Sequence, residues 1–263
     1  MKPARERNPN FPSGTEAFFL FLALFLVEYV LGLALYDARR ILGLSPPQLV
    51  AMVMLLGNGL VLSGILHFKH MGYRELLHPT QTSPAATAMF IVPLVLLLVP
   101  GLLLVMWRVV DVVMAWFPLS RAEEVMFARM DGPELAGALA ICVLAPVVEE
   151  MLFRGVILRS FLLQYDRRQA IWGSALLFGV AHLNIYQFFV ALGLGFVLGW
   201  LYERSRSLIP CIALHASYNT AVFLSTYYLI PDGAGIVLPS LPASVWIVAS
   251  GMALLAVLGL RRL

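Results

Sequence analysis

The sequence predicts an all-α, polytopic membrane protein of about eight transmembrane helices that enclose a polar cavity. Its composition is 60% hydrophobic and only 13% charged, and its mean hydropathy is +0.86, far from an ordinary soluble domain. Apolar segments close to membrane-spanning length recur along the whole chain. A few ionisable residues lie inside these segments, where they are tolerated mainly around a cavity or opposite a partner.

Eight apolar segments have the length, or nearly the length, that a hydrocarbon core of about 30 Å requires. They are expected near residues 16–36, 48–68, 86–107, 134–163, 169–184, 186–203, 208–229 and 243–260. The third could break at Val99–Gly101, where a proline removes a backbone donor. The fifth is too short to cross completely, so we expect its turn near Asn184 to be buried in protein or to line a wet cavity. In the sixth, Gly195 and Gly199 form a GxxxG pair that predicts close helix packing.

The segment from Arg108 to Pro133 mixes charged and apolar residues and connects the third and fourth predicted helices. It includes the amphipathic stretch VVDVVMAWF, a pattern typical of a helix that lies along the membrane surface. We therefore divide the chain into three regions. Residues 1–133 hold three helices and this surface segment, residues 134–229 hold four helices with most of the intramembrane polar residues, and residues 230–263 hold the last helix.

The distribution of basic residues predicts a multi-pass protein with both termini in the cytoplasm, in the plasma membrane or, in a prokaryote, the inner membrane. The first apolar stretch, about 19 residues, is longer than the hydrophobic region of a signal peptide, so we expect a retained span. With the N-terminus inside, twelve basic residues fall on the cytoplasmic side and five outside. The twelve are Lys2, Arg5, Arg7, Lys69, Arg74, Arg159, Arg167, Arg168, Arg204, Arg206, Arg261 and Arg262, and the five are Arg39, Arg40, Arg108, Arg121 and Arg129. Because these residues lie in short loops, they set orientation and do not indicate nucleic-acid binding.

The two cysteines, Cys142 and Cys211, both lie within apolar segments. This placement favours small buried side chains over a disulfide framework or a thiolate metal site. The sequence predicts no cofactor and no bound metal.

The stretch LAPVVEEMLFRG, residues 144–155, places two carboxylates and an arginine inside the fourth apolar segment. Their insertion costs roughly 8–10 kcal/mol, against a return of roughly 5 kcal/mol from the apolar residues of the span. Glu150 and Arg154 are four residues apart with the glutamate N-terminal, so we predict that they pair on one helical face. Glu149 is rotated by about 100° and must face another helix or a water-filled cavity. Pro146 cannot donate a backbone hydrogen bond and loosens the helix about one turn earlier.

Polar side chains recur at helical spacing on two later segments. His182 follows Phe178 by four residues in the fifth segment, and Asn219 follows His215 by four residues in the seventh. A lone histidine in an apolar helix is often a core residue with satisfied hydrogen bonds. Together with the glutamates, however, these side chains could line one cavity.

A count of helical rise tests whether these residues share a depth in the membrane. If the fourth and fifth segments turn at residues 165–166, Glu149 and His182 lie equally far from the turn, at about 25 Å. The same count from Arg206 places His215 only about 14 Å deep, roughly 10 Å short of the other two. Tilt or a hairpin that projects past the membrane surface would have to close this gap.

Three motifs carry a resemblance to a known family. EEMLFR looks like EExxxR, Phe178–His182 looks like FxxxH, and His215–Asn219 looks like HxxxN. In this order along residues 134–229, they resemble the motifs of the CAAX-protease and bacteriocin-processing family, which includes the Ras-converting prenyl proteases. Each motif is weak alone, and the ordered set is specific.

The resemblance implies a glutamic intramembrane endopeptidase with an eight-helix fold and a conical cavity open to the membrane and the cytosolic side. By this likeness, Glu149 and His182 hold and activate the attacking water. His215 and Asn219 form the oxyanion hole, and the predicted ion pair of EEMLFR supports the site.

The chemistry of these side chains, considered without the resemblance, supports similar roles. A carboxylate in a membrane cavity can act as general base for water, an imidazole can orient that water, and two side-chain donors can meet the charge that develops on a carbonyl. A spanning helix hides its carbonyls, so the substrate must be extended or unwound at the cut. The predicted partner is therefore a membrane-anchored protein or peptide within the lipid bilayer. No feature of the sequence indicates that the protein recognises a prenyl group. The motifs are also shared with processors of secreted peptides and of C-terminal sorting anchors.

Other functions stay open on the sequence alone. His182, His215 and Glu149 could form a zinc site of a metallopeptidase, although no local HExxH pattern is present. The buried charges could instead serve a proton-coupled transporter, or hold together the helices of a non-proteolytic scaffold. Glu28, in the middle of the first segment, has no counterpart in the motifs and is either a satisfied polar contact or part of the cavity.

Overall fold

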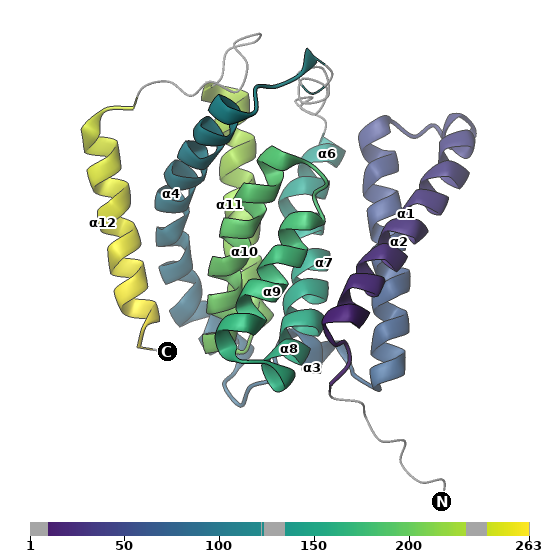
Figure 1. Cartoon of the computed structure of the whole chain (residues 1–263), viewed down its shortest axis with the longest axis horizontal. Helices are drawn as coiled ribbons and strands as arrows, with labels where there is room; N and C mark the ends of the chain where they lie inside the picture. Colours follow the sequence, from purple (N-terminus) through teal and green to yellow (C-terminus); the bar gives the residue numbers. More distant parts are fainter. Residues whose placement is uncertain (1–9, 122, 124–134, 230–240, 263) are drawn as a thin grey trace, which may run out of the picture.

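The computed structural model describes residues 10–121, 123, 135–229 and 241–262. Every regular element within these residues is a helix, which confirms the predicted all-α class (Figure 1). Seven helical stretches are long and apolar enough to cross a membrane, so the chain is a multi-pass membrane protein. The predicted boundary at 133/134 lies outside the described residues, as do the basic residues Lys2, Arg5, Arg7 and Arg129, and the boundary at 229/230 falls where the described part of α11 ends.

The first four helices are α1 (Gly14–Leu42), α2 (Pro46–Lys69), α3 (Tyr73–Leu77) and α4 (Pro84–Trp116). Serine side chains begin three of them, because Ser13, Ser45 and Ser83 each accept the backbone N–H three residues further on. Gly43 ends α1 with φ 65°, a left-handed conformation that glycine adopts at little cost.

Helix α4 corrects two expectations. It runs unbroken through Val99–Gly101, and it includes residues 109–116, which were expected to lie on the membrane surface. Gly101 faces α12, where an added Cβ would lie 2.9 Å from the Cβ of Ala253. The glycine therefore serves a close helix contact, and packing against α11 and α12 outweighs the one backbone bond lost at Pro100.

The fourth predicted helix is one continuous stretch, Leu135–Gln164, whose hydrogen-bond pattern changes along its length. It consists of α6 (Leu135–Leu139), the π-helical η1 (Ala140–Leu144), α7 (Ala145–Glu150), the π-helical η2 (Met151–Leu158) and α8 (Arg159–Gln164). π-helical turns are rare and are frequent at functional sites. The EEMLFR motif lies where α7 meets η2.

The remaining helices are α9 (Arg167–Val180), α10 (Ile185–Ser205), α11 (Leu208–Leu229) and α12 (Ala243–Leu260). The 14 residues of α9 rise only about 21 Å, which confirms that the fifth predicted segment is too short to cross. The GxxxG prediction is also confirmed. A Cβ on Gly195 would lie 3.2 Å from the Cα of Ala175, and one on Gly199 would lie 3.1 Å from Cγ2 of Ile171, both on α9.

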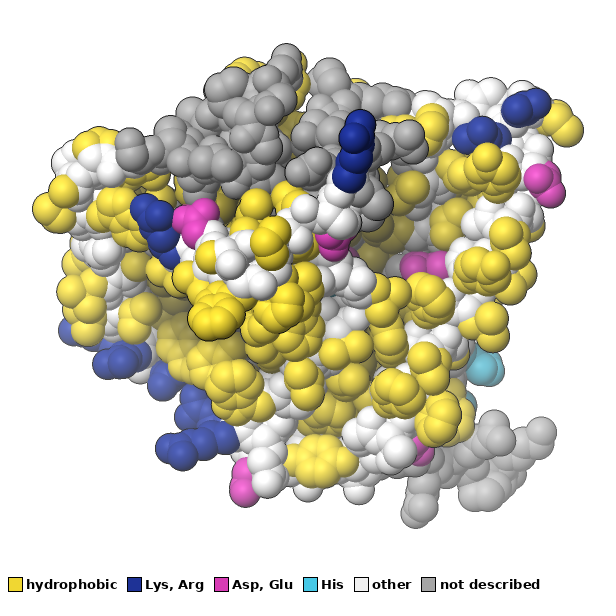
Figure 2. Space-filling model, turned by 45° about the horizontal axis from the view of Figure 1, so that its top comes forward, with side chains coloured by type: hydrophobic (Ala, Val, Ile, Leu, Met, Phe, Trp, Pro, Cys, Tyr) yellow, Lys and Arg dark blue, Asp and Glu magenta, His cyan; other side chains and the backbone are white. Residues whose placement is uncertain are grey.

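The helices form a bundle with the α1–α2 hairpin at one edge and α12 at the other (Figure 1). Helix α4 packs against α11 and α12, α10 packs against α9, and α1 packs mainly against α2. Helix α1 begins, and α12 ends, at the same end of the bundle. The face shown in Figure 2 is mostly apolar, and Lys and Arg side chains lie mainly toward its lower left and upper right. Which side of the membrane each end faces stays a prediction from the charge bias.

We predict that Gly195→Val lowers the free energy of unfolding by about 1–3 kcal/mol, because the added methyl groups meet the backbone of α9. Thermal unfolding of the detergent-solubilised protein measures this change. Gly64→Val is the matched control, since a Cβ on Gly64 has nothing within 4 Å. Equal stability of the two variants would contradict the close contact between α9 and α10.

Candidate active site

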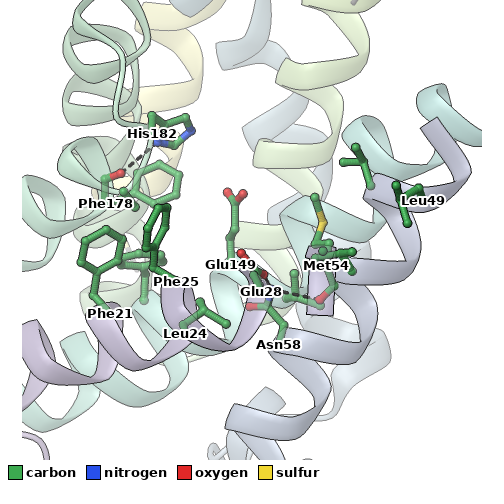
Figure 3. Close-up of a pocket in the computed structure, with 16 residues that line it drawn as sticks. Phe21, Leu24, Phe25, Glu28, Leu49, Met54, Asn58, Glu149, Phe178 and His182 are labelled. Carbon is green, nitrogen blue, oxygen red and sulfur yellow. Dashed lines mark hydrogen bonds between the residues drawn. The ribbon is translucent and has the colours of Figure 1, made fainter. Parts of the chain in front are cut away.

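A cavity of about 390 Å³ lies between the α1–α2 hairpin and the helices that carry the motifs (Figure 3). Its wall is mostly apolar and comes from α1, α2, α7, η2, α9 and the turn after α9. The polar residues among the described lining are Glu28, Asn58, Glu149 and His182. The structure thus brings Glu149 and His182, predicted from separate motifs, to one cavity.

Glu149 lies between this cavity and α11. Its side chain is 28% exposed, and its Oε2 lies 3.7 Å from Nε2 of His215. That distance is too long for a hydrogen bond, so the two groups face each other without direct bonding. Glu149 has no partner inside its own helix. It faces both of the surroundings that the sequence allowed, a cavity and another helix.

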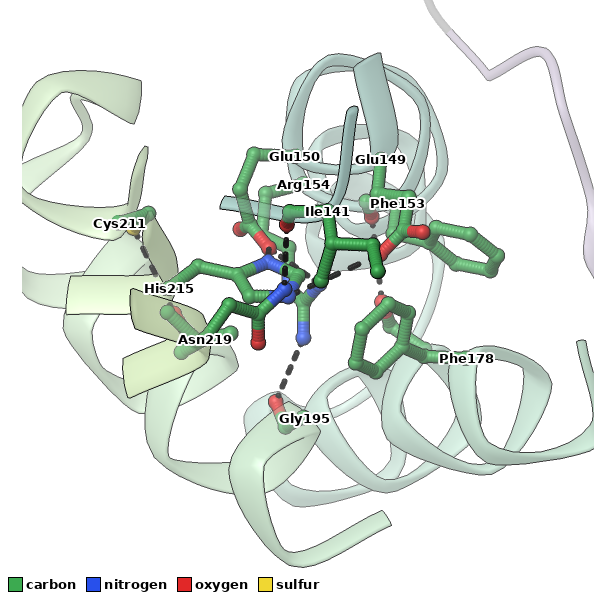
Figure 4. A network of polar contacts seen from close by, with 12 residues as sticks. Ile141, Glu149, Glu150, Phe153, Arg154, Phe178, Gly195, Cys211, His215 and Asn219 are labelled. Atoms are coloured by element: carbon green, nitrogen blue, oxygen red, sulfur yellow. Dashed lines mark hydrogen bonds and ion pairs between the residues drawn. The ribbon is translucent and has the colours of Figure 1, made fainter. Parts of the chain in front are cut away.

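Glu150 is the centre of a buried polar network (Figure 4). Its Oε1 accepts hydrogen bonds from Nη1 of Arg154 and from Nδ1 of His215, both at 2.8 Å. The predicted ion pair is confirmed, and both of its side chains are fully buried. Arg154 also donates from Nη2 to the carbonyl of Gly195 at 3.1 Å, and its guanidinium lies 4.4 Å from the centroid of the Phe178 ring. The network therefore joins α7, η2, α9, α10 and α11.

The structure closes the gap in depth that the count of helical rise left for His215. Its contacts with both motif glutamates place it at their level, whereas the count from Arg206 placed it roughly 10 Å short. That count took the turn before α11 to lie at the membrane surface. Instead Ser207 is fully buried, its Oγ accepts the N–H of Ile209 at 3.2 Å, and it lies 2.8 Å from Nδ1 of the buried His78. The turn before α11 is thus covered by protein, and a count that starts from it does not give the level of His215.

His182 lies in the turn that follows α9. Its Nδ1 is 3.0 Å from the carbonyl oxygen of Phe178, and the two rings meet edge to face with centroids 5.2 Å apart. A carbonyl oxygen only accepts, so Nδ1 donates, and the neutral ring presents Nε2 as an acceptor. No hydrogen bond or ion pair joins His182 to Glu149 in the described part of the chain, so the two residues share the cavity without contact.

Asn219 satisfies a backbone carbonyl that Pro146 leaves without a helical donor. In η1 the N–H of Ala145 bonds to the carbonyl of Ala140. The next carbonyl, of Ile141, would need an N–H at Pro146, which has none. Asn219 supplies it instead, with Nδ2 donating to the Ile141 carbonyl at 3.0 Å.

The cavity also shows what sequence reasoning missed. Glu28 lines the cavity and accepts a hydrogen bond from Nδ2 of Asn58 at 2.8 Å, so both readings of Glu28 hold. Asn58 was not singled out, although an asparagine within the second apolar segment was a signal for a polar partner. Conversely, His215 and Asn219 are not among the described residues that line the cavity.

Neither a metal-ligand cluster nor a disulfide is seen at the site. Among the described residues, no three His, Cys, Asp or Glu side chains are grouped so that they could hold a metal ion. Cys142 and Cys211 are free and buried, as predicted.

Comparison with known families gives one match. Residues 131–221, roughly a third of the chain, match the family model described as Type II CAAX prenyl endopeptidase Rce1-like. The match covers all three motifs and confirms the resemblance seen in the sequence. It supports the interpretation that the chain is a membrane protease of the CAAX type. No curated protein and no solved structure matched the chain.

We predict that Arg154→Leu destabilises the protein by about 3–5 kcal/mol, because it leaves the carboxylate of Glu150 buried without its cationic partner. Thermal unfolding in detergent measures the loss. Arg167→Leu is the matched control, since Arg167 pairs with Glu203 while half exposed, and its loss costs at most about 1 kcal/mol. If the two variants unfold at the same temperature, the buried network does not hold the helices together.

Proposed function

We propose that this chain, whose residues 131–221 match the Rce1-like CAAX prenyl endopeptidase family, is a metal-independent intramembrane endopeptidase. It hydrolyses a peptide bond of a membrane-associated protein or peptide with water activated by Glu149 and His182. The observation that carries the proposal is that these two side chains line one cavity within the membrane-spanning bundle.

The attacking water binds between Glu149 and His182. The carboxylate accepts one water proton as general base, and Nε2 of His182 accepts a hydrogen bond from the other. The water oxygen attacks the scissile carbonyl carbon, and the carbonyl oxygen takes the negative charge. When the C–N bond breaks, the proton held by Glu149 passes to the leaving amine, and the carboxylate is restored.

His215 stabilises the oxyanion from Nε2. Because Nδ1 donates to Glu150, the ring can donate from Nε2 only as the imidazolium. The two motif carboxylates then balance the charges of Arg154 and His215. One such donor is typically worth about 2.7–4 kcal/mol in the transition state. Asn219 has a second amide N–H beyond the one given to Ile141, which adds a second donor to the oxyanion hole.

The substrate enters as an extended segment beside a membrane anchor. The apolar wall of the cavity suits side chains near such an anchor, and an extended backbone exposes the carbonyl that a helix would hide. The partners in this function are a membrane-anchored peptide or protein and the surrounding bilayer.

We predict that Glu149→Gln and His182→Ala each lower proteolysis by at least about 100-fold, the usual contribution of a general acid–base group. Terminal-peptide mass spectrometry of membrane proteomes at equal protein levels measures which new termini vanish. Glu203→Gln is the control, because Glu203 pairs with Arg167 away from the cavity. If the termini persist in both site variants, this mechanism is ruled out. The buried charged residues then have a structural or transport role.

We predict that chelators such as EDTA and 1,10-phenanthroline leave the activity of the purified protein unchanged, because Glu149 and His182 activate water without a Lewis acid. Activity assays before and after dialysis against chelator test this. Loss of activity that zinc restores would favour the metallopeptidase instead, with His182, His215 and Glu149 as ligands.

A further inference from the structure

Glu28 brings a second carboxylate to the cavity from the side opposite the motif helices. It lies on α1, in the middle of a membrane-spanning helix, and it lines the cavity together with Glu149 (Figure 3). An ionisable residue at such a position is costly to insert and is usually functional. None of the three motifs includes it, and the proposed hydrolysis does not use it.

Helix α2 is shaped to hold this carboxylate. A Cβ on Gly57 would lie 2.5 Å from Cγ of Glu28, so the glycine leaves the space that the glutamate side chain occupies. The next residue, Asn58, is buried and donates from Nδ2 to Oε1 of Glu28 at 2.8 Å and to the carbonyl of Met54 at 3.1 Å. The glutamate is therefore fixed in place at the cavity wall.

The cavity holds two carboxyl groups that face it from different helices. Glu28 lines it from α1 and Glu149 lines it from α7. None of the sixteen described residues that line the cavity is Lys or Arg. The hydrogen bond from Asn58 engages only Oε1 of Glu28, and within the described residues Oε2 has no hydrogen-bond partner. The described lining thus supplies two carboxyl groups and no Lys or Arg to pair with them.

We propose that Glu28 determines specificity by binding the side chain of a lysine or arginine close to the scissile bond of the substrate. This inference deepens the proposed peptidase function and rests on it. A cation beside Glu28 forms charge-assisted hydrogen bonds with its carboxylate, and such bonds are strong where water is largely excluded. The same field disfavours a substrate that places a carboxylate next to Glu28.

A cleavage-profile experiment tests the proposal. The purified protein in lipid vesicles is given membrane-anchored peptides that carry a short randomised segment beside the anchor, and mass spectrometry reads the products. We expect the wild type to enrich Lys and Arg at one position near the cut. Glu28→Gln keeps the size of the side chain and the acceptor for Asn58, and it should lower that enrichment by about 10-fold or more while leaving the other positions unchanged.

Two further variants separate charge from folding. Glu28→Asp keeps the negative charge and should retain most of the basic preference. Glu203→Gln removes a carboxylate outside the cavity and should leave the profile unchanged. A basic preference that survives in Glu28→Gln, or a profile without any basic preference in the wild type, overturns the inference and makes Glu28 a link between α1 and α2.

The same experiment tests the proposed peptidase function separately, through the variant Glu149→Gln. If the wild type cleaves no peptide of the set and Glu149→Gln behaves identically, the peptidase function itself fails. If the wild type cleaves and Glu149→Gln does not, the peptidase function stands, and only the comparison at Glu28 decides the specificity.

Discussion

One carboxylate oxygen, Oε1 of Glu150, receives both Arg154 and His215 at 2.8 Å, and the rest of the site depends on this double contact. A buried anion in a membrane protein is tolerated only when its charge and its lone pairs are met. Meeting them draws α11 against the helix that carries the glutamates, and the guanidinium extends the connection to α10 through Gly195. The orientation of the His215 ring, with Nε2 toward Glu149, follows from the same bond.

The membrane imposes a second constraint, on the backbone. With little water available, a carbonyl that loses its helical donor must find another within the protein. At Ile141 the donor is Asn219, because Pro146 has no N–H to give. A residue assigned by its motif to oxyanion binding therefore also maintains the helix that presents Glu149. The bond to Ile141 and the proposed oxyanion contact fall on one side chain, so a variant of Asn219 tests the two together.

The α1–α2 hairpin meets the helices that carry the motifs mainly through α2, which packs against α6, η1 and α7. At the start of α1, Tyr165 Oη accepts the N–H of Gly14 at 3.0 Å, and Gln164 donates to the carbonyl of Pro12 at 3.0 Å. Beyond these contacts α1 packs chiefly on α2, which leaves room between the hairpin and α7 and α9. The width of the cavity therefore depends on the hairpin, which carries Glu28 on the cavity wall.

The sequence by itself determined what is local. Hydropathy and segment length located the spans, spacing of four residues predicted the pair of Glu150 and Arg154, and length showed that α9 is too short to cross, because all three follow from the rise and rotation of one helix. Only the tertiary structure decided what depends on contacts between helices. It placed His215 at the level of the two glutamates, and it kept α4 continuous past Pro100 through packing at Gly101. It also joined Glu28 to Asn58, since no periodicity within one helix specifies which residue of another helix it meets.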